Sequence, residues 1–167
     1  MTGTSSIDVA PSGGRLIDET LFHGAGGEIA LAGSRCVACG AMTFPVQRSC
    51  PRCAGDDVES VPLPRTGTLW GFTVQAFPPK TPYLLADERP FAPYAVGYVD
   101  LDHRVLVETR IVTDDPASLA VGDEMTLVLE QLRRDESGPV LTYAFAPVGA
   151  RRASRGSDAE NTQDDAP

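Results

Sequence analysis

Basic residues are scarce in this chain of 167 residues. It carries 14 Lys and Arg against 23 Asp and Glu, which gives a formal net charge of −9 at pH 7. Nucleic-acid binding usually starts from a basic surface that releases counterions from phosphate. The longest basic runs here are the pairs Arg133–Arg134 and Arg151–Arg152. The charge balance therefore argues against a nucleic-acid-binding protein.

The sequence also lacks a long apolar run and a targeting segment. A membrane-spanning helix needs about 20 consecutive apolar residues, and no stretch approaches that length. The first 14 residues are rich in Ser, Gly and Thr, and they lack the charged start and apolar stretch of a secretion signal. We therefore expect a cytoplasmic protein without membrane contact.

Few side chains are available for catalysis. Only two histidines occur, His23 and His103, and neither a Ser-His-Asp order nor a phosphate-binding glycine loop is recognisable. His103 lies in an expected hairpin turn, where a solvated polar residue is typical, and His23 lies beside a glycine-rich break. We interpret the acidic pairs Asp56–Asp57 and Asp114–Asp115 as solvated loop charges. The chain is expected to have no activity alone.

The four cysteines stand in two pairs of equal spacing. They are Cys36, Cys39, Cys50 and Cys53, in the pattern C-x2-C-x10-C-x2-C. Each CxxC segment bends back on itself and offers two thiolates, and two such knuckles close a tetrahedral zinc site with Zn–S bonds of about 2.3 Å. Gly40 suits the tight backbone of the first knuckle. Because four thiolates leave no open coordination position, we predict a structural zinc.

Other uses of four cysteines fit the sequence less well. Two disulfides are uncommon in a reducing cytoplasm, and a redox CxxC motif normally occurs singly at the start of a helix. An iron–sulfur cluster also accepts four thiolates, but paired knuckles in a short ribbon more often hold zinc. Metal binding would also remove every cysteine from the possible nucleophiles.

The rest of the sequence predicts mainly β structure. Apolar alternation and short apolar runs predict five strands, near residues 66–76, 94–101, 103–113, 125–132 and 140–146. A turn at Asp102–His103 would join the second and third strands, and a short helical turn capped by Gly122 would precede the fourth. This pattern fits a small barrel of the OB type. The aromatic residues at alternating strand positions are expected in its core: Trp70, Phe72, Tyr94 and Tyr98.

The domain organisation follows from these patterns. Leu16, Ile17, Leu21 and Phe22 stand at helical spacing and predict a helical segment, which the glycines after His23 interrupt. The last 18 residues carry too little apolar surface to fold. The expected units are a disordered 1–14, a helical segment at 15–34, a zinc ribbon at 35–60, an OB-fold domain at 61–149 and a disordered acidic tail at 150–167.

The chain resembles the family of zinc-ribbon OB-fold proteins that is catalogued as domain of unknown function 35 and often described as acyl-CoA-associated. The resemblance covers roughly Leu21 to Pro147. It is carried by the segments FHGAGGEIALAGSRCVACGAMTFPVQRSCPRC, RTGTLWGFTV, PFAPYAVGYVDLDHRVLVETRIV, LAVGDEMTLVLE and LTYAFAP. It implies a mainly β fold with an N-terminal helical hairpin, a rubredoxin-like zinc ribbon and a C-terminal five-stranded OB-fold barrel.

The resemblance also implies a non-catalytic accessory subunit. Family members partner thiolase-like enzymes, including thiolases and retro-aldolases of lipid and steroid side-chain metabolism, and the partner carries the nucleophile. We therefore expect a thiolase-like partner, a heterotetramer built on the partner's dimer, and acyl-CoA at the shared interface. The alternative is a single-stranded nucleic-acid-binding OB-fold protein whose aromatic side chains stack on bases, which the acidic charge balance disfavours.

Two further groups of residues are assigned to this function. Lys80 and Arg89 lie in the long proline-rich connection 77–93, and long loops in compact domains are often functional. They are candidates for the phosphates of coenzyme A, and they also suit ordinary solubilising charges. The ribbon offers four apolar positions as a docking surface, each of which can instead pack on the barrel: Val37, Met42, Phe44 and Val46.

Overall fold

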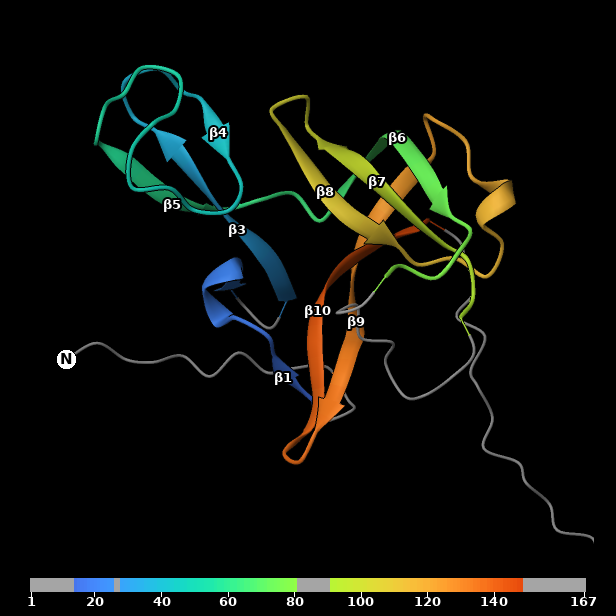
Figure 1. The fold of residues 1–167 in the computed structure, drawn as a ribbon. Helices are drawn as coiled ribbons and strands as arrows, with labels where there is room; N and C mark the ends of the chain where they lie inside the picture. Colours follow the sequence, from blue (N-terminus) through green and yellow to red (C-terminus); the bar gives the residue numbers. More distant parts are fainter. Residues whose placement is uncertain (1–13, 26–27, 81–90, 149–167) are drawn as a thin grey trace, which may run out of the picture.

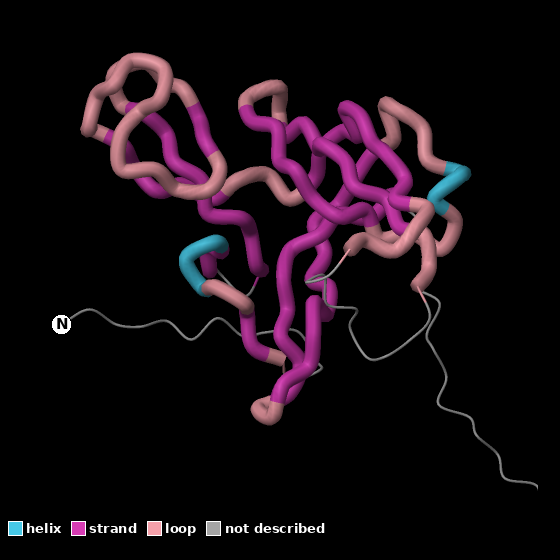
Figure 2. Tube along the Cα trace, viewed as in Figure 1, coloured by secondary structure: helices cyan, strands magenta, loops and turns pink. Residues whose placement is uncertain are grey.

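In the computed structural model, strands make up nearly all regular structure (Figures 1 and 2). The structure describes residues 14–25, 28–80 and 91–148. The strands are β1 (Arg15–Leu16), β2 (Phe22–Ala25), β3 (Glu28–Cys36), β4 (Met42–Thr43), β5 (Val58–Pro62), β6 (Thr66–Gln75), β7 (Tyr94–Leu101), β8 (Val105–Ile111), β9 (Glu124–Asp135) and β10 (Gly138–Pro147). Two 3-10 turns accompany them, η1 (Glu19–Leu21) and η3 (Pro116–Ser118). No helix in the described ranges is long and apolar enough to span a membrane.

Five strands close a barrel. β6 pairs antiparallel with β7, and β7 pairs antiparallel with β8. β10 pairs parallel with β8 and antiparallel with β9, and β9 returns to β6. This closed arrangement of five strands matches the OB fold, as the apolar pattern predicted. The β7–β8 turn is also confirmed, because the N–H of Arg104 donates to the carbonyl of Leu101 at 3.1 Å. The two central residues of this turn, Asp102 and His103, have φ values of 56° and 54°, as a type I′ turn requires.

The second sheet is built around β3. This strand pairs with β2 near its start, where Phe22 lies opposite Leu31, and with β5 and β4 near its end. Gly33 lies at the crowded centre of the sheet, where a Cβ atom would come within 2.5 Å of Cδ2 of Leu63. Only glycine fits there without moving Leu63. The sheet ends at Cys36, which begins the first zinc knuckle.

The helical segment predicted over residues 15–34 and the helical hairpin implied by the resemblance are wrong. The described residues of this region form β1, β2 and β3, and the single 3-10 turn η1 is capped by Asp18, which accepts a hydrogen bond from the N–H of Thr20 at 2.9 Å. The glycines disfavour a helix. Hydrogen bonds from β2, β4 and β5 to β3 outweigh the helix propensity of residues such as Leu31.

The segments predicted to be disordered, 1–14 and 150–167, lie outside the described residues, apart from Gly14. Gly14 begins the described chain and is buried. A Cβ atom there would come within 2.8 Å of Leu141 on β10. The described chain therefore starts as part of the packed structure, one residue before β1.

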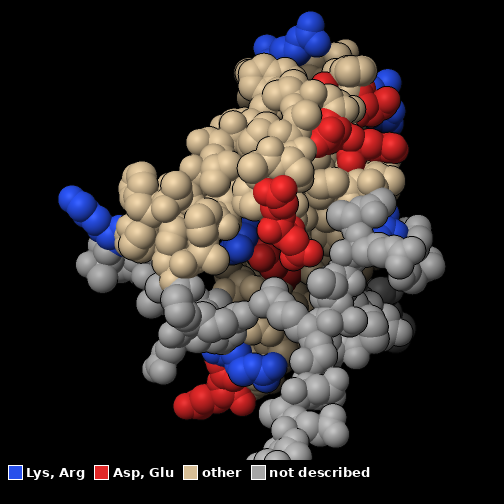
Figure 3. Space-filling view, turned by 90° about the vertical axis from the view of Figure 1, so that its right-hand side faces the viewer, with Lys and Arg blue, Asp and Glu red and all other residues tan. Residues whose placement is uncertain are grey.

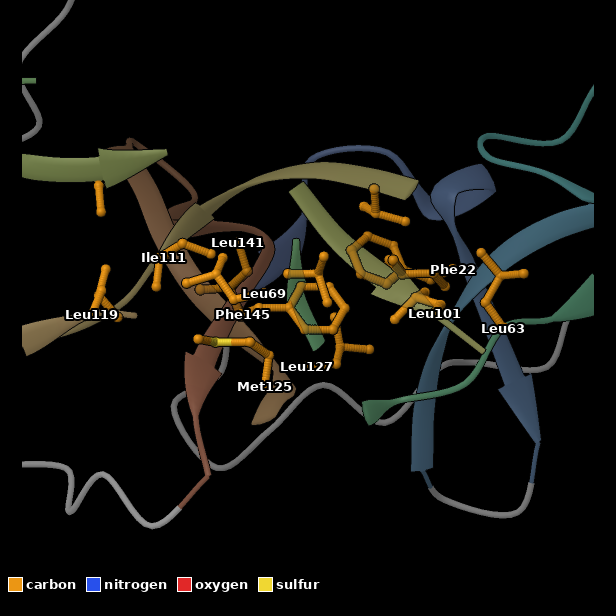
Figure 4. Packing of buried hydrophobic residues seen from close by; sticks show 14 of the residues in the cluster. Phe22, Leu63, Leu69, Leu101, Ile111, Leu119, Met125, Leu127, Leu141 and Phe145 are labelled. Carbon is orange, nitrogen blue, oxygen red and sulfur yellow. The ribbon is translucent and has the colours of Figure 1, made fainter. Parts of the chain in front are cut away.

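One hydrophobic core joins the barrel to the ribbon sheet. Phe145, Leu69 and Met125 are fully buried inside the barrel. Phe22 and Leu63, from the ribbon side, belong to the same cluster and continue it outwards from the barrel (Figure 4). Each buried side chain of this size contributes about 1.5–3 kcal/mol. The shared core therefore holds the ribbon sheet in a fixed position on the barrel.

Candidate metal centre

The four cysteines meet at one point beyond the end of β3. Cys36 is the last residue of β3 and Cys39 follows in the turn before β4, while Cys50 and Cys53 lie between β4 and β5. All four sulfur atoms lie within 4.8 Å of one another. The Sγ atoms of Cys36 and Cys53 are 3.6 Å apart, and those of Cys39 and Cys50 are 3.5 Å apart.

These distances fit a tetrahedral metal site. Zinc–sulfur bonds of about 2.3 Å place the sulfurs of a regular tetrahedron about 3.8 Å apart. Bonded sulfurs in a disulfide would be about 2.05 Å apart, much closer than either measured pair. The sulfurs are therefore spaced to surround a single ion, and the sequence prediction of a structural zinc site is confirmed by this geometry.

The two knuckles repeat the same backbone hydrogen bonds. In the first, the N–H of Gly40 donates to the carbonyl of Cys36 at 2.9 Å, and the N–H of Cys36 donates to Ala41. In the second, the N–H of Ala54 donates to the carbonyl of Cys50 at 2.8 Å, and the N–H of Cys50 donates to the carbonyl of Gly55. The fourth residue after each leading cysteine has a positive φ, 71° at Gly40 and 59° at Ala54.

The sulfurs differ in how readily they lose a proton. Backbone N–H groups of the second knuckle, that of Cys53 first, lower the pKa of Cys50 to about 6, and the N–H of Arg52 lies 3.4 Å from its sulfur. The N–H of Gly55 lowers the pKa of Cys53, but the neighbouring thiols outweigh it and raise that pKa to about 12. Within the cluster, the thiol of Cys50 therefore loses its proton readily, whereas that of Cys53 keeps it. A dication supplies the charge that lets all four become thiolates.

The site is closed and suited to structure rather than catalysis. Cys36 and Cys50 are only 2% and 3% exposed, whereas Cys39 is half-buried and Cys53 is exposed. The site is closed by coordination, because four thiolates fill a tetrahedral shell. Within residues 14–25, 28–80 and 91–148, no other group of His, Cys, Asp or Glu side chains is arranged to hold a metal. A zinc ion here would cross-link β3 to the segment before β5.

The four apolar ribbon positions divide into two pairs. Val37 and Val46 are 51% and 41% exposed. Met42 and Phe44 are half-buried and pack against the shared core. The ring of Phe44 meets that of Tyr143 on β10 edge to face, with centroids 5.3 Å apart. Met42 and Phe44 therefore lie at the junction of ribbon and barrel, whereas the two valines face outwards.

Of the two candidate coenzyme A residues, only Lys80 lies in the described part of the chain. Lys80 is exposed shortly after the end of β6, and Arg89 lies outside the described residues. The other end of β7 faces the ribbon, because Nη1 of Arg104 in the β7–β8 turn lies 3.9 Å from Sδ of Met42. Figure 1 shows the β7–β8 turn on the ribbon side and the end of β6 on the far side. β6, the strand that leads to Lys80, therefore ends on the side of the barrel away from the ribbon.

The two histidines do not form a catalytic group. The side chain of His103 is 91% exposed, with Nδ1 2.9 Å from Oδ2 of Asp100, as expected for a solvated turn residue. His23 lies on β2 in the ribbon sheet. Its Nδ1 atom is buried and makes no hydrogen bond within the described chain. The structure thus keeps the two imidazoles on separate elements, β2 and the β7–β8 turn.

The prediction that the strand aromatics lie in the core is wrong for two of them. Trp70 is 59% exposed and Tyr98 is 41% exposed, whereas Phe72 and Tyr94 are half-buried. Trp70 stands where the register of β6 shifts between Leu69 and Gly71, so it falls out of the simple alternation. For Tyr98 a sequence signal exists, because its neighbours Gly97 and Val99 are the inward positions of β7.

Comparison with known proteins places this architecture in a family. Two family models match, "ChsH2, rubredoxin-like zinc ribbon domain" over residues 24–59 and "ChsH2, C-terminal OB-fold domain" over residues 60–130. A DUF35 domain-containing scaffold protein of Methanothermobacter thermautotrophicus is 32% identical over 117 residues, which span 69% of this chain and 83% of that protein. The chain belongs to the DUF35 family. The resemblance found in the sequence is therefore confirmed.

Further matches to this DUF35 chain include an enzyme subunit and a solved structure. The benzoylsuccinyl-CoA thiolase subunit BbsA of Thauera aromatica is 30% identical over 119 residues, spanning 71% of this chain and 76% of that protein. The structure of an Ltp2-ChsH2(DUF35) aldolase matches with a TM-score of 0.55 and 24% identity, over 71% of this chain and 84% of that one. At this identity the structural match supports the fold.

Proposed function

We propose that this chain is a non-catalytic, zinc-containing accessory subunit of a thiolase-like acyl-CoA enzyme, either a thiolase or a retro-aldolase of lipid or steroid side-chain metabolism. The observation that carries the proposal is its relationship to proteins named as a scaffold and as a thiolase subunit. The closed four-cysteine site agrees with it, because every cysteine of the chain belongs to that site.

The proposal gives the partner the chemistry and this chain the support. Thiolase-type reactions need a nucleophile and an acid–base pair in one site. In the described residues the cysteines are committed to the ribbon, and His23 and His103 lie on different elements. The proposal includes a cytoplasmic location, which metal-binding thiolates rather than disulfides favour.

The finer arrangement belongs to the same proposal. Two copies of this chain would bind a dimer of the partner to form a heterotetramer, with acyl-CoA at the shared interface. Lys80 is exposed in the connection that follows β6, where its ammonium group can approach a phosphate. Arg89, on the same connection, would be the second phosphate contact. Val37 and Val46 remain candidates for contact with the partner.

Single-stranded nucleic-acid binding has one observation in its favour, the exposure of Trp70 and Tyr98 on the barrel. Stacking platforms of OB folds, however, lie in positively charged grooves that follow the phosphate backbone. Here the phenol of Tyr98 donates to the carboxylate of Glu108 at 3.1 Å, and the whole chain carries a charge of −9. The accessory-subunit function is therefore the better supported of the two.

Co-purification tests this proposal. The chain, carrying an affinity tag, is co-expressed with a thiolase-like protein of the same organism, and the eluate is analysed by size exclusion with light scattering. We expect a stable complex with the mass of two copies of each protein. A biosynthetic thiolase that is stable as its own homo-oligomer serves as the control. Separate elution of the two proteins at micromolar concentration would contradict the proposal, as would tight binding of a labelled single-stranded oligonucleotide by the chain.

A further inference from the structure

Three exposed hydrophobic side chains lie on neighbouring strands on the outer face of the barrel. They are Trp70 on β6, Tyr98 on β7 and Leu106 on β8, which are 59%, 41% and 45% exposed. The rings of Trp70 and Tyr98 meet edge to face, with centroids 6.3 Å apart. Leu106 pairs with Asp100, two positions along β7 from Tyr98. We call Trp70, Tyr98 and Leu106 the outer stripe.

The outer stripe has the composition of a protein-binding hot spot. Isolated apolar residues are common on protein surfaces, but a contiguous group of large ones marks an interaction site. Tryptophan and tyrosine are enriched among the residues that dominate binding energies. Two of its members, Tyr98 and Leu106, lie on the second and third barrel strands, whose face OB folds use for their ligands, and Trp70 lies beside them on the first strand.

Acidic groups border the stripe on both sides. On the β8 side, Glu108 accepts the hydrogen bond from Tyr98. On the β9 side, Glu124 lies opposite Thr68 of β6, and the carbonyl of the preceding residue accepts from the N–H of Leu69 at 2.8 Å. Acidic side chains also gather beside a broad uncharged area on the side of the molecule that carries η3 (Figure 3).

The arginines on these strands are already paired with acids. Nε of Arg104 lies 3.4 Å from Oδ2 of Asp102. Nε of Arg110 lies 3.4 Å from Oε1 of Glu130, and the guanidinium carbon of Arg110 lies 4.8 Å from the ring centroid of Tyr94. The border of the stripe is therefore acidic in its net charge.

This charge distribution decides between two occupants. A second copy of the chain would bring Glu108 and Glu124 of one molecule against the same acids of the other, and like charges brought together at an interface are unfavourable. A partner with an apolar pocket edged by Lys and Arg would instead be complementary. The stripe also crosses β6, β7 and β8, the strands that run away from the ribbon side of the barrel.

We infer that the outer stripe is the surface through which this chain docks on its thiolase-like partner, with Trp70 as the central anchor and the bordering acids facing basic residues of the partner. The inference rests on the proposed function, because it takes the partner from there. It differs from a docking surface on the ribbon, since the stripe lies on the strands of the barrel and its two aromatic residues are expected to carry most of the affinity.

A matched pair of leucines tests the inference. Leu106 and Leu132 are 45% and 44% exposed, but Leu132 lies in the part of β9 beyond its pairing with β6, outside the stripe. We expect Leu106→Ser to weaken partner binding about 10-fold or more and Trp70→Ala about 30-fold or more, while Leu132→Ser changes it less than about threefold. Zinc content and circular dichroism of each variant show that the fold is kept, and binding is measured by calorimetry.

The wild-type chain provides a second measurement that does not depend on substitutions. Trp70 is its single tryptophan, so 5-fluorotryptophan gives one ¹⁹F resonance that reports on the stripe alone. We expect this resonance to shift and broaden when unlabelled partner is added, and binding to weaken as salt rises. A wild-type complex with an unchanged ¹⁹F signal and full binding by Trp70→Ala would overturn the inference while leaving the proposed function intact. A wild-type chain that does not bind the partner at all would overturn both, and self-association lost in Trp70→Ala would assign the stripe to a second copy.

Discussion

Backbone N–H groups of its own knuckle lower the pKa of the zinc ligand Cys50. Replacing it by serine removes a soft anionic ligand, and the hydroxyl that replaces it is not ionised at neutral pH. Changes to groups that merely orient a ligand cost roughly 10–100-fold in metal affinity, so Cys50→Ser is expected to cost more than about 100-fold. Elemental analysis should find one zinc per wild-type chain and much less in the variant. A folded, metal-free wild-type protein, or one containing iron, would contradict the assignment.

Gly40 and Ala54 occupy equivalent places in the two knuckles, yet only one of them is glycine. A non-glycine residue in the left-handed region costs about 1–2 kcal/mol. We therefore expect Gly40→Ala to lower the free energy of unfolding by about 1 kcal/mol, since a Cβ atom there meets nothing within 4 Å. Ala54→Gly should raise it by up to about 1 kcal/mol. Denaturant unfolding of the zinc-loaded proteins checks both signs. If the two substitutions changed the free energy of unfolding in the same direction, the knuckle symmetry would be contradicted.

Tyr98 gives a pH-dependent prediction. Its hydrogen bond to Glu108, and then the charge of that carboxylate, raise the pKa of Tyr98 above its ordinary value. A raised pKa means that the folded state favours the neutral phenol. This contribution to stability is complete below the ordinary pKa of about 10 and is lost as pH rises through the raised one. The Cζ resonance of ¹³C-labelled Tyr98 should titrate at lower pH in Glu108→Gln.

The control for this titration is Glu124→Gln, because the pKa of Tyr98 is raised by the hydrogen bond and charge of Glu108 and then by burial, with no contribution from Glu124. The titration of Tyr143 should move in the same direction in Glu108→Gln but less, since burial is the main reason that its pKa is raised and the charge of Glu108 comes second. An unchanged Tyr98 titration in Glu108→Gln would show that the hydrogen bond does not persist in solution.

The zinc site could be predicted from the sequence, whereas the exposed outer stripe of the barrel could not. Four cysteines in paired spacing specify their own geometry, because the coordination chemistry of one ion requires them to meet. The exposure of Trp70 depends instead on an irregular register in β6. Strand alternation assigns a side chain to a face only while pairing is regular. The positive φ of Ala54 could not be predicted, because alanine, unlike glycine, is not typical of that conformation.

At the scale of elements, Phe44 connects the segment after β4 to β10. It is half-buried and contacts Tyr143. Replacing a fully buried phenylalanine by alanine costs about 3–5 kcal/mol, so a half-buried one is expected to cost about 1–3 kcal/mol. The matched control, Val46→Ala, removes an exposed side chain of the same segment and should stay within about 0.5 kcal/mol. Denaturant unfolding compares the two, and equal small effects would mean that Phe44 does not hold the ribbon on the barrel.

In the N-terminal region, the sequence periodicity predicts a helix, but pairing with other strands produces β structure instead. Leu16, Ile17 and Leu21 have helical spacing, and yet the chain forms β1, one 3-10 turn and β2. β1 is only two residues long and exists because β10 offers it a parallel partner. Such pairing is set by a strand more than 100 positions away in the sequence, which no local pattern contains. The five barrel strands were predictable because their apolar pattern and their turns agree.

At the scale of the whole molecule, zinc and packing stabilise different ends of the same body. The ribbon tip is held by four sulfurs, whereas the barrel is held by a core that includes Phe145 and Leu69. The junction at Phe22 and Leu63 makes these parts continuous. A rigid body of this kind presents the barrel face and the ribbon to a partner in a fixed relation.

The central claim is that this chain supports catalysis by a partner and performs none itself. The most direct measurement is the steady-state rate of acyl-CoA cleavage or condensation by the purified chain alone, by the thiolase-like partner alone and by their complex. We expect no turnover above buffer from the chain alone, and turnover by the complex that is lost when the partner's nucleophile is replaced. Turnover by the chain alone that disappears when His103 or another residue of this chain is replaced would contradict the claim.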